Sequence, residues 1–313
     1  MKFLITGASG QLAREFQRRF ERNGIEFAAP PECKFDITDI SAVRETISAY
    51  RPTVVLNCAA YNDVEKAESD WTAAHAVNAE AVSNLAEICE DNGARFVHFS
   101  SDYVFDGTKE GFYTEEDAVN PLNNYGSSKL AGERAVRDRI SVVSGQKPAG
   151  NSHSASHDSK PPTHELQSPE CTALILRVSW VYGTGRQNFF YKMRHWAQKN
   201  KVLKIVWDQI SVPTFTEDIV TYTLQALDAG LDGIYHLTNS GYASRYETAR
   251  YFFTRQEGQE SDKLILPIST AEFAATATRP FFSKMSNARL SSALDVTIPS
   301  WQDALNRFIN RGM

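Results

Sequence analysis

Short apolar runs alternate with amphipathic segments through the N-terminal part of this chain. The apolar runs centre on Phe3, Phe27, Val54, Phe96 and Ile175, and the segments of helical period between them centre on Phe16, Val43, Leu85 and Ala135. Strands and helices that alternate in this way form a parallel sheet with helices on both faces. We therefore predict an α/β fold with a doubly wound parallel sheet.

The first predicted strand, Met1 to Thr6, runs directly into a glycine turn and then into an amphipathic segment, Arg14 to Asn23. In a βαβ unit of this order, backbone amides and a helix N-terminus face a pyrophosphate, and glycine lets the phosphate approach closely. This indicates a Rossmann-type sheet that binds a dinucleotide. The residues expected at its phosphates are Gly7, Ser9, Gly10, Gln11 and Leu12.

Two later segments are expected to contact the same dinucleotide. Asp36 and Ile37 follow the second strand, near Ile25 to Ala29, and would line the adenine, with a loop-capping Asp36 as the alternative. The strand that begins at Thr53 ends in small residues that would let the cofactor pass, and the contacts expected there are Ala59, Ala60 and Tyr61. Since the second strand lacks the acidic residue that binds a ribose 2′-hydroxyl, both NADPH and NADH are open as the cofactor.

A tyrosine and a lysine four residues apart carry a hypothesis of proton transfer. Tyr125 and Lys129 lie in a predicted helix, where positions i and i+4 share a face, so the Lys129 ammonium can lie beside the Tyr125 phenol. A nearby cation would lower the pKa of Tyr125, which could then act as a general acid or base. Ser101, just past the strand Arg95 to Ser100, would hydrogen-bond the same substrate oxygen. The alternative is a solvated helix pair without catalytic function.

The composition excludes several classes of protein. Of the 313 residues, 42% are hydrophobic and 23% charged, and the net charge of -5 gives no electrostatic reason to expect nucleic acid. The four cysteines are widely spaced, without metal-ligand spacing. No apolar run reaches membrane-spanning length, and the apolar start is too short for a signal peptide. We expect a cytoplasmic protein without nucleic acid or membrane partners.

The regular alternation ends in the second half of the chain, which suggests a second unit. We predict that residues 1–178 form the dinucleotide-binding domain and that 214–237 return to it. Residues 179–213 and 238–313 are expected to form a smaller C-terminal lobe that binds the substrate. Residues 141–170 are rich in Ser, Pro, Gly, His and Asn without an apolar period, and they predict a polar loop insert.

Several contiguous segments resemble the dTDP-4-dehydrorhamnose reductase family, within the extended short-chain dehydrogenase/reductase superfamily. They follow the family's order over nearly the whole chain: Asn57 to Glu68, Ser100 to Gly107, Pro121 to Glu133, Arg177 to Gly183, Asp208 with Gln209, Pro213 with Thr214, Tyr235 to Leu237, and Arg279 with Pro280. The chain departs from the family pattern in the polar insert and in Phe281 and Phe282.

The resemblance implies reduction of the C4 ketone of dTDP-4-dehydro-6-deoxy-L-mannose by NADPH or NADH, which yields dTDP-L-rhamnose. By the family pattern, Tyr125 supplies the proton, Lys129 holds the nicotinamide ribose, and Ser101, where the family usually carries threonine, polarises the carbonyl. Tyr103 and Trp180 would face the sugar, with core or rim aromatics as the alternative. Some family members use magnesium at a subunit contact, and these residues leave both the metal and a homodimeric assembly open.

Two other functions stay open. The fold hosts many reactions, so the substrate of a reductase or epimerase could be a different nucleotide sugar. The chain also shares its Ser100 to Gly107 segment with the regulatory subunit of methionine adenosyltransferase, which works through protein contact. Against the regulatory function, Val64 to Glu68 and Ser179 to Gly183 resemble the reductases.

Overall fold

A computed structural model describes residues 1–143, 173–185, 188–257 and 264–311 of the chain. The predicted insert at 141–170 lies almost wholly outside these residues, since only 141–143 are described, as the end of helix α6 (Asn124–Val143). Within the described ranges, no helix is long and apolar enough to cross a membrane.

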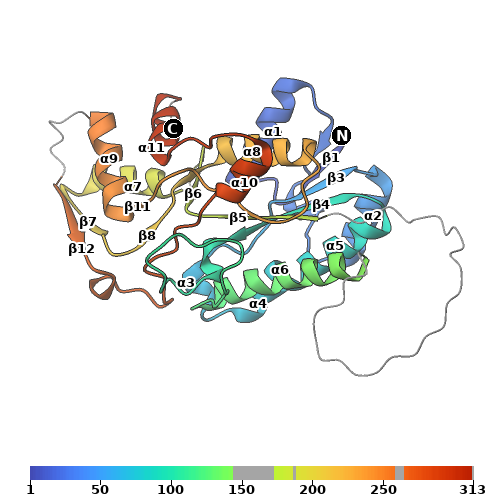
Figure 1. Cartoon of the computed structure of the whole chain (residues 1–313), viewed down its shortest axis with the longest axis horizontal. Helices are drawn as coiled ribbons and strands as arrows, with labels where there is room; N and C mark the ends of the chain where they lie inside the picture. Colours follow the sequence, from blue (N-terminus) through green and yellow to red (C-terminus); the bar gives the residue numbers. More distant parts are fainter. Residues whose placement is uncertain (144–172, 186–187, 258–263, 312–313) are drawn as a thin grey trace, which may run out of the picture.

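A parallel sheet forms the centre of the larger part of the molecule (Figure 1). Its strands are β1 (Phe3–Ile5), β2 (Phe27–Ala28), β3 (Val54–Asn57), β4 (Arg95–Ser101), β5 (Ala173–Val178) and β10 (Gly233–His236). They are hydrogen-bonded in the order β10-β5-β4-β3-β1-β2, and each neighbouring pair is parallel. The longest register pairs β4 with β5, from Phe96 opposite Ala173 to Ser101 opposite Val178. The predicted doubly wound sheet is confirmed.

Helices cover both faces of this sheet, because each buries an apolar stripe against it. On one face lie α1 (Gln11–Asn23), α8 (Thr216–Asp228) and α10 (Ala288–Leu294), whose core includes Phe16 and Val220. On the other face lie α2 (Ile40–Tyr50), α5 (Ala81–Asp91) and α6, around Val43 and Leu85. Shorter helical segments precede α5: α3 (Val64–Ala67), α4 (Trp71–His75) and the π-helical Ala76–Glu80.

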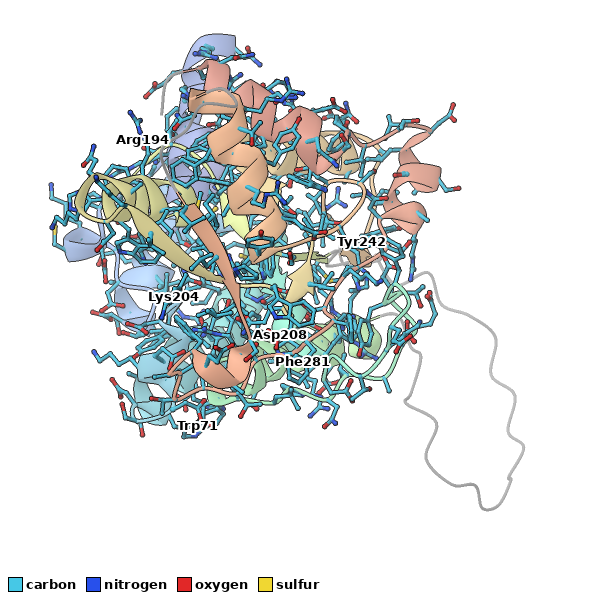
Figure 2. The ribbon with its side chains drawn as sticks, turned by 90° about the vertical axis from the view of Figure 1, so that its left-hand side faces the viewer. Trp71, Arg194, Lys204, Asp208, Tyr242 and Phe281 are labelled. Atoms are coloured by element: carbon cyan, nitrogen blue, oxygen red, sulfur yellow. The ribbon has the colours of Figure 1, made fainter. Side chains whose placement is uncertain are left out.

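A smaller lobe lies at one end of the molecule, on the left in Figure 1. It contains α7 (Phe189–Lys199), α9 (Arg245–Glu257) and α11 (Trp301–Asn310), and a parallel pair of β7 (Val202–Val206) with β12 (Leu264–Ile268). Two short pairs join β6 (Val181–Tyr182) to β9 (Thr214–Phe215) and β8 (Ile210–Ser211) to β11 (Ala243–Ser244). Figure 2 shows this end of the molecule, with Arg194, Lys204 and Tyr242 on its exposed surface.

The strand order creates a place for a ligand between β1 and β3. From β1 the chain passes to β2 on one side, and then through α2 to β3 on the other side of β1. Ligands of open α/β sheets bind beyond the carboxyl ends of the strands at such a reversal. The glycine turn after β1 and the small residues after β3 both lie there, so the fold brings the predicted dinucleotide contacts to one edge.

Candidate active site

A cavity of about 320 Å³ lies at the carboxyl ends of the central strands, and residues of the smaller lobe close its other side. Its size suits a small-molecule site. Most of the residues predicted from the sequence line it: Gly10, Gln11, Leu12, Ala59, Ala60, Ser101, Tyr103, Tyr125, Lys129 and Trp180. Segments that are distant in the sequence therefore meet around one space.

The other predicted cofactor residues do not line this cavity. Ser9 is exposed, and Tyr61 packs beside Tyr125. The Asp36 carboxylate accepts hydrogen bonds from the amide and hydroxyl of Thr38, as the loop-capping alternative requires. The Ile37 side chain is buried in the core of the α2 face, which leaves only its backbone for a cofactor. Contacts of these residues with a cofactor stay predictions.

The glycine turn is shaped to receive phosphate. Gly7 has φ of +61°, and a Cβ there would lie 2.7 Å from the Ala59 Cα, so only glycine lets the turns after β1 and β3 meet. Gly10 caps α1 without a side-chain hydrogen bond, and the first turn of the helix has no acidic residue. The first amides of α1 are thus left to an anion, which the helix dipole also favours. Together with Gly7, this fits the predicted dinucleotide.

Helix α6 carries Tyr125 and Lys129, and two devices fix its position. The Asn123 side chain accepts a hydrogen bond of 2.8 Å from the Gly126 amide at the start of the helix. A Cβ on Gly126 would lie 2.3 Å from the carbonyl oxygen of Tyr103, so the glycine lets α6 pack directly on the segment after β4. The result is that Tyr125 faces Ser101 across the cavity edge.

The Tyr125 side chain is buried, and it lines the cavity together with Ser101. Burial raises the pKa of Tyr125 above its ordinary value, against the smaller lowering by Ser101. Here the structure differs from the sequence-based expectation that Lys129 lowers this pKa, because the Lys129 ammonium is turned toward a carbonyl. A phenol that keeps its proton is the form required of a proton donor.

Lys129 is 2% exposed, and its ammonium donates a 2.7 Å hydrogen bond to the carbonyl oxygen of Phe99. Burial lowers the pKa of Lys129 to about 8, although the Glu133 carboxylate opposes the shift. Glu133 itself accepts two hydrogen bonds from the buried Arg177 guanidinium, at 2.9 and 2.7 Å. Lys129 is therefore a buried cation whose charge is only partly compensated.

Sequence reasoning missed a buried carboxylate next to Ser101. Asp102 accepts hydrogen bonds from the hydroxyls of Ser101 at 3.2 Å, Ser211 at 3.0 Å and Ser283 at 2.6 Å. Burial raises the pKa of Asp102, and these hydroxyls partly offset the shift. Its place in the Ser100 to Gly107 segment was a signal, but its serine partners come from distant parts of the chain.

A second missed feature is a line of polar side chains beneath Lys129. The Lys129 ammonium lies 3.5 Å from His98 Nε2, the Asn57 amide nitrogen lies 3.2 Å from His98 Nδ1, and the Thr6 hydroxyl donates to the Asn57 amide oxygen at 2.7 Å. Burial lowers the pKa of His98 far below its ordinary value, so the imidazole is neutral. Polar residues inside apolar strands were the available signal.

The smaller lobe adds two side chains at the far wall of the cavity. Trp180 has φ of +39°, a backbone conformation that is uncommon for a bulky residue, and Arg245 stacks with its guanidinium carbon 3.8 Å from the indole centroid. Nothing in the sequence pattern singled out Arg245. No group of three or more His, Cys, Asp or Glu side chains in the described ranges is arranged to hold a metal ion.

Comparisons with known proteins agree with this geometry. A family model described as the RmlD substrate binding domain matches residues 1–144 and 164–313. The chain is 33% identical to a dTDP-4-dehydrorhamnose reductase of Sinorhizobium fredii, with 99% of this chain and 97% of the relative covered. It is 31% identical to a dTDP-4-keto-6-deoxy-D-glucose reductase of Streptomyces niveus, with 98% and 96% covered.

A solved structure carries the same architecture. The crystal structure of a dTDP-4-dehydrorhamnose reductase from Bacillus anthracis, in complex with NADP, superimposes with a TM-score of 0.85 at 30% identity and covers 99% of this chain and 100% of that one. The family model and the relatives span nearly the whole described fold, including the segments that line the cavity. The chain therefore belongs to the dTDP-4-dehydrorhamnose reductase family.

Proposed function

We propose that this protein reduces the C4 ketone of dTDP-4-dehydro-6-deoxy-L-mannose to the alcohol of dTDP-L-rhamnose with NADPH or NADH. The observation that carries the proposal is the meeting of Tyr125, Ser101 and Lys129 in the cavity that the glycine turn also borders. Relatives of more than 30% identity over the whole chain are dTDP-sugar reductases, which supports the substrate class.

Tyr125 is the proposed proton donor and Ser101 the group that polarises the carbonyl. The reduced nicotinamide supplies the hydride when bound. As C4 receives it, the electron pair of the C=O π bond moves to oxygen, and the phenolic proton of Tyr125 completes the alcohol. Solvent then returns a proton to the phenolate, so one proton is consumed per turnover. Ser101 and Tyr125 line the same cavity, where both hydroxyls can meet one carbonyl oxygen.

Lys129 is the proposed holder of the nicotinamide ribose. Its ammonium donates to Phe99 O and has further N–H donors for ribose oxygens. Tyr103, whose ring meets that of Tyr125 edge-on at 5.5 Å, and Trp180 are the proposed contacts of the sugar. Aromatic faces suit the apolar side of a deoxysugar.

A second candidate is the reduction of another dTDP-4-keto sugar. The Streptomyces niveus relative, at 31% identity, is a dTDP-4-keto-6-deoxy-D-glucose reductase. Both functions use the same chemistry and differ in the configuration of the sugar that the smaller lobe accepts.

The decisive experiment follows NADPH oxidation with each dTDP-4-keto sugar generated in place. Turnover with the L-mannose-configured ketone is expected, and Tyr125→Phe is expected to lower kcat by roughly 100-fold or more, because only the phenolic proton is removed. NADPH binding, measured by fluorescence, serves as the control and is expected to persist in the variant. Full activity of Tyr125→Phe would overturn the mechanism.

The remaining organisation is proposed on the same basis. Residues 1–178 with 214–237 hold the dinucleotide, and 179–213 with 238–313 bind the sugar nucleotide, although α10 of the last range packs on the central sheet. The family model leaves residues 145–163 unmatched, which supports an insert within 141–170. We propose a homodimer in the cytoplasm, and light scattering would test the assembly. Light scattering with and without magnesium would test whether the ion acts at a subunit contact.

A further inference from the structure

The Arg245 side chain stands between two cavities. It lines the catalytic cavity and also a second cavity of about 260 Å³ inside the smaller lobe. Asn62, Trp180 and Val181 also line both cavities, so the two cavities meet along the wall that these residues form with Arg245. The second cavity continues past Arg245 to aromatic residues of the lobe, Tyr182, Phe189 and Phe190. Arg245 is thus placed at the passage from the reacting centre to a further binding space.

The Arg245 guanidinium has cation–π contacts but no anionic partner. It lies 3.8 Å from the centroid of the Trp180 indole ring and 5.2 Å from that of Phe189. Among the described residues it makes no ion pair and no hydrogen bond, although a guanidinium offers five N–H donors. Burial lowers the pKa of Arg245 to about 10; Tyr103 and the Asp102 carboxylate oppose this shift, and Arg279 adds to it.

A second arginine, whose charge influences Arg245, provides the contrast. The Arg279 guanidinium donates a 2.5 Å hydrogen bond to the Glu65 carboxylate, which also accepts from the amides of Thr276 and Ala277. Arg279 is therefore neutralised within the protein. Arg245 is left as a half-buried cation that faces the cavity wall without a carboxylate.

The position of this cation matches the chemistry of the substrate. In a nucleotide sugar the diphosphate is attached at C1, across the ring from the C4 that reacts. Tyr103, whose ring meets that of Tyr125 edge-on at 5.5 Å, lines the same cavity as Arg245. A substrate in this cavity with its C4 at Tyr125 can therefore present its diphosphate to Arg245.

We propose that Arg245 binds the diphosphate of the nucleotide sugar at the junction of the two cavities, and that the aromatic second cavity receives the nucleoside. The assignment rests on the proposed function and names a residue that determines recognition of the nucleotide end of the substrate. The planar fork of arginine suits phosphate oxygens, and stacking on Trp180 holds it in place.

Calorimetric titration of the intact protein with dTDP and with thymidine tests this assignment without turnover. Arg245→Gln is expected to weaken dTDP binding roughly tenfold or more, the loss of a charged hydrogen bond, and to leave thymidine binding unchanged. Arg245→Lys keeps the charge without the fork and is expected to fall between the two. Arg250→Gln, in the same helix but at the wall of a separate cavity, is the matched control and should bind like the wild type.

The outcomes separate the inference from the proposed reaction. Equal dTDP affinity in the wild type and Arg245→Gln would overturn the role of Arg245, as would an equal loss for dTDP and thymidine, which indicates mere support of Trp180. Should Arg245→Gln fail to fold, Arg245→Lys carries the same comparison. A wild type that binds dTDP through Arg245 yet reduces no dTDP-4-keto sugar would refute the reaction and leave the diphosphate site intact.

Discussion

The Ser101 hydroxyl carries one proton, and two neighbours determine where that proton points. The hydroxyl lies 3.2 Å from an oxygen of Asp102, and it lines the cavity together with the Tyr125 phenol. A carbonyl oxygen placed between Ser101 and Tyr125 would draw the Ser101 proton away from Asp102. The hydroxyl is therefore the part of residue 101 that the reaction needs, whether serine or the family's usual threonine provides it.

We predict that Ser101→Ala lowers kcat roughly 100-fold, the effect of removing one hydrogen-bond donor at a developing oxyanion. Ser101→Thr is expected to keep near wild-type kcat, because it retains the hydroxyl. Steady-state kinetics with saturating NADPH measures both. An equal loss in the two variants would show that packing at residue 101, and not the donor, matters.

The lowered pKa of Lys129 predicts a pH dependence of cofactor binding. As pH rises through about 8, the ammonium loses its charge. Hydrogen bonds from a charged donor are worth about 1 kcal/mol more than neutral ones, so NADPH affinity should fall about fivefold between pH 7 and 9. Fluorescence titration across this range measures it, and Lys129→Met should bind weakly at every pH without the trend.

The same burial predicts a conflict between stability and function. The pKa of Lys129 in the folded protein, about 8, lies below the ordinary value of 10.5. Between these two pH values Lys129 is protonated in the unfolded chain but neutral in the folded one. The free energy of unfolding therefore rises with pH across this window. At pH 7 the buried charge costs about 3 kcal/mol. Lys129→Met should therefore unfold at higher urea concentration than the wild type at pH 7, with the difference vanishing above pH 10.5. A less stable Lys129→Met at pH 7 would contradict this account.

At the scale of elements, the site depends on how closely α6 approaches its neighbours. Gly126 packs against the carbonyl oxygen of Tyr103, and a Cβ on Gly132 would lie 2.2 Å from the carbonyl oxygen of Asn78. These two glycines let one helix contact both the segment after β4 and the π-helical turn before α5. Any added side-chain atom would displace the helix that carries Tyr125 and Lys129.

We predict that Gly126→Ala destabilises the protein by about 1–3 kcal/mol through overpacking and lowers kcat, because α6 shifts away from Ser101. Gly111→Ala is the matched control, since a Cβ there meets nothing closer than 3.6 Å, at the flexible Lys109 side chain. Urea unfolding measures the stability of the two variants, and steady-state kinetics measures their kcat. Wild-type behaviour of Gly126→Ala would mean that the helix position is less tightly fixed than its contacts indicate.

Elements with a strong local pattern could be predicted, and those built by distant pairing could not. The glycine turn, the α6 pair and the strands near Phe3, Val54 and Phe96 follow from apolar runs and helical period. The paired strands β7 and β12 lie about sixty residues apart in the sequence. Ser211 and Ser283, which donate hydrogen bonds to Asp102, come from two further separate segments. No local pattern encodes such contacts. The spacing of Tyr125 and Lys129 predicted a lowered pKa of Tyr125, but burial raises it. Burial is a property of the assembled fold, which the spacing does not show.

At the scale of the whole molecule, the region between α6 and β5 contains an addition to the part of the chain that the family model matches. The family model leaves residues 145–163 unmatched, while the helix before and the strand after them carry Lys129 and Arg177. We predict that deletion of 145–163, which leaves 144 and 164–172 to join α6 to β5, keeps kcat and KM within about twofold of wild type, since the family model matches the chain on both sides without these residues. A folded deletion variant without activity would show that the insert acts in the reaction.

The buried pair of Glu133 and Arg177 joins α6 to β5 at the centre of the molecule. Glu133→Gln leaves the Arg177 cation buried without a carboxylate, so it is expected to destabilise the fold by about 3–5 kcal/mol. Urea unfolding followed by circular dichroism measures the loss. The exposed pair of Arg289 and Glu116 provides the control, and Glu116→Gln should change stability by less than about 1 kcal/mol.

The place of β10 in the sheet has a consequence for synthesis on the ribosome. This strand completes one edge beside β5, yet it is encoded after β6 to β9 of the smaller lobe, whose own β12 and α11 emerge later still. During synthesis, the central sheet therefore cannot be completed by β10 until β6 to β9 of the smaller lobe have been made. The smaller lobe in turn cannot be completed until α11 has left the exit tunnel. Neither part is therefore one continuous stretch of the described chain, and truncation before β10 should leave both parts incomplete.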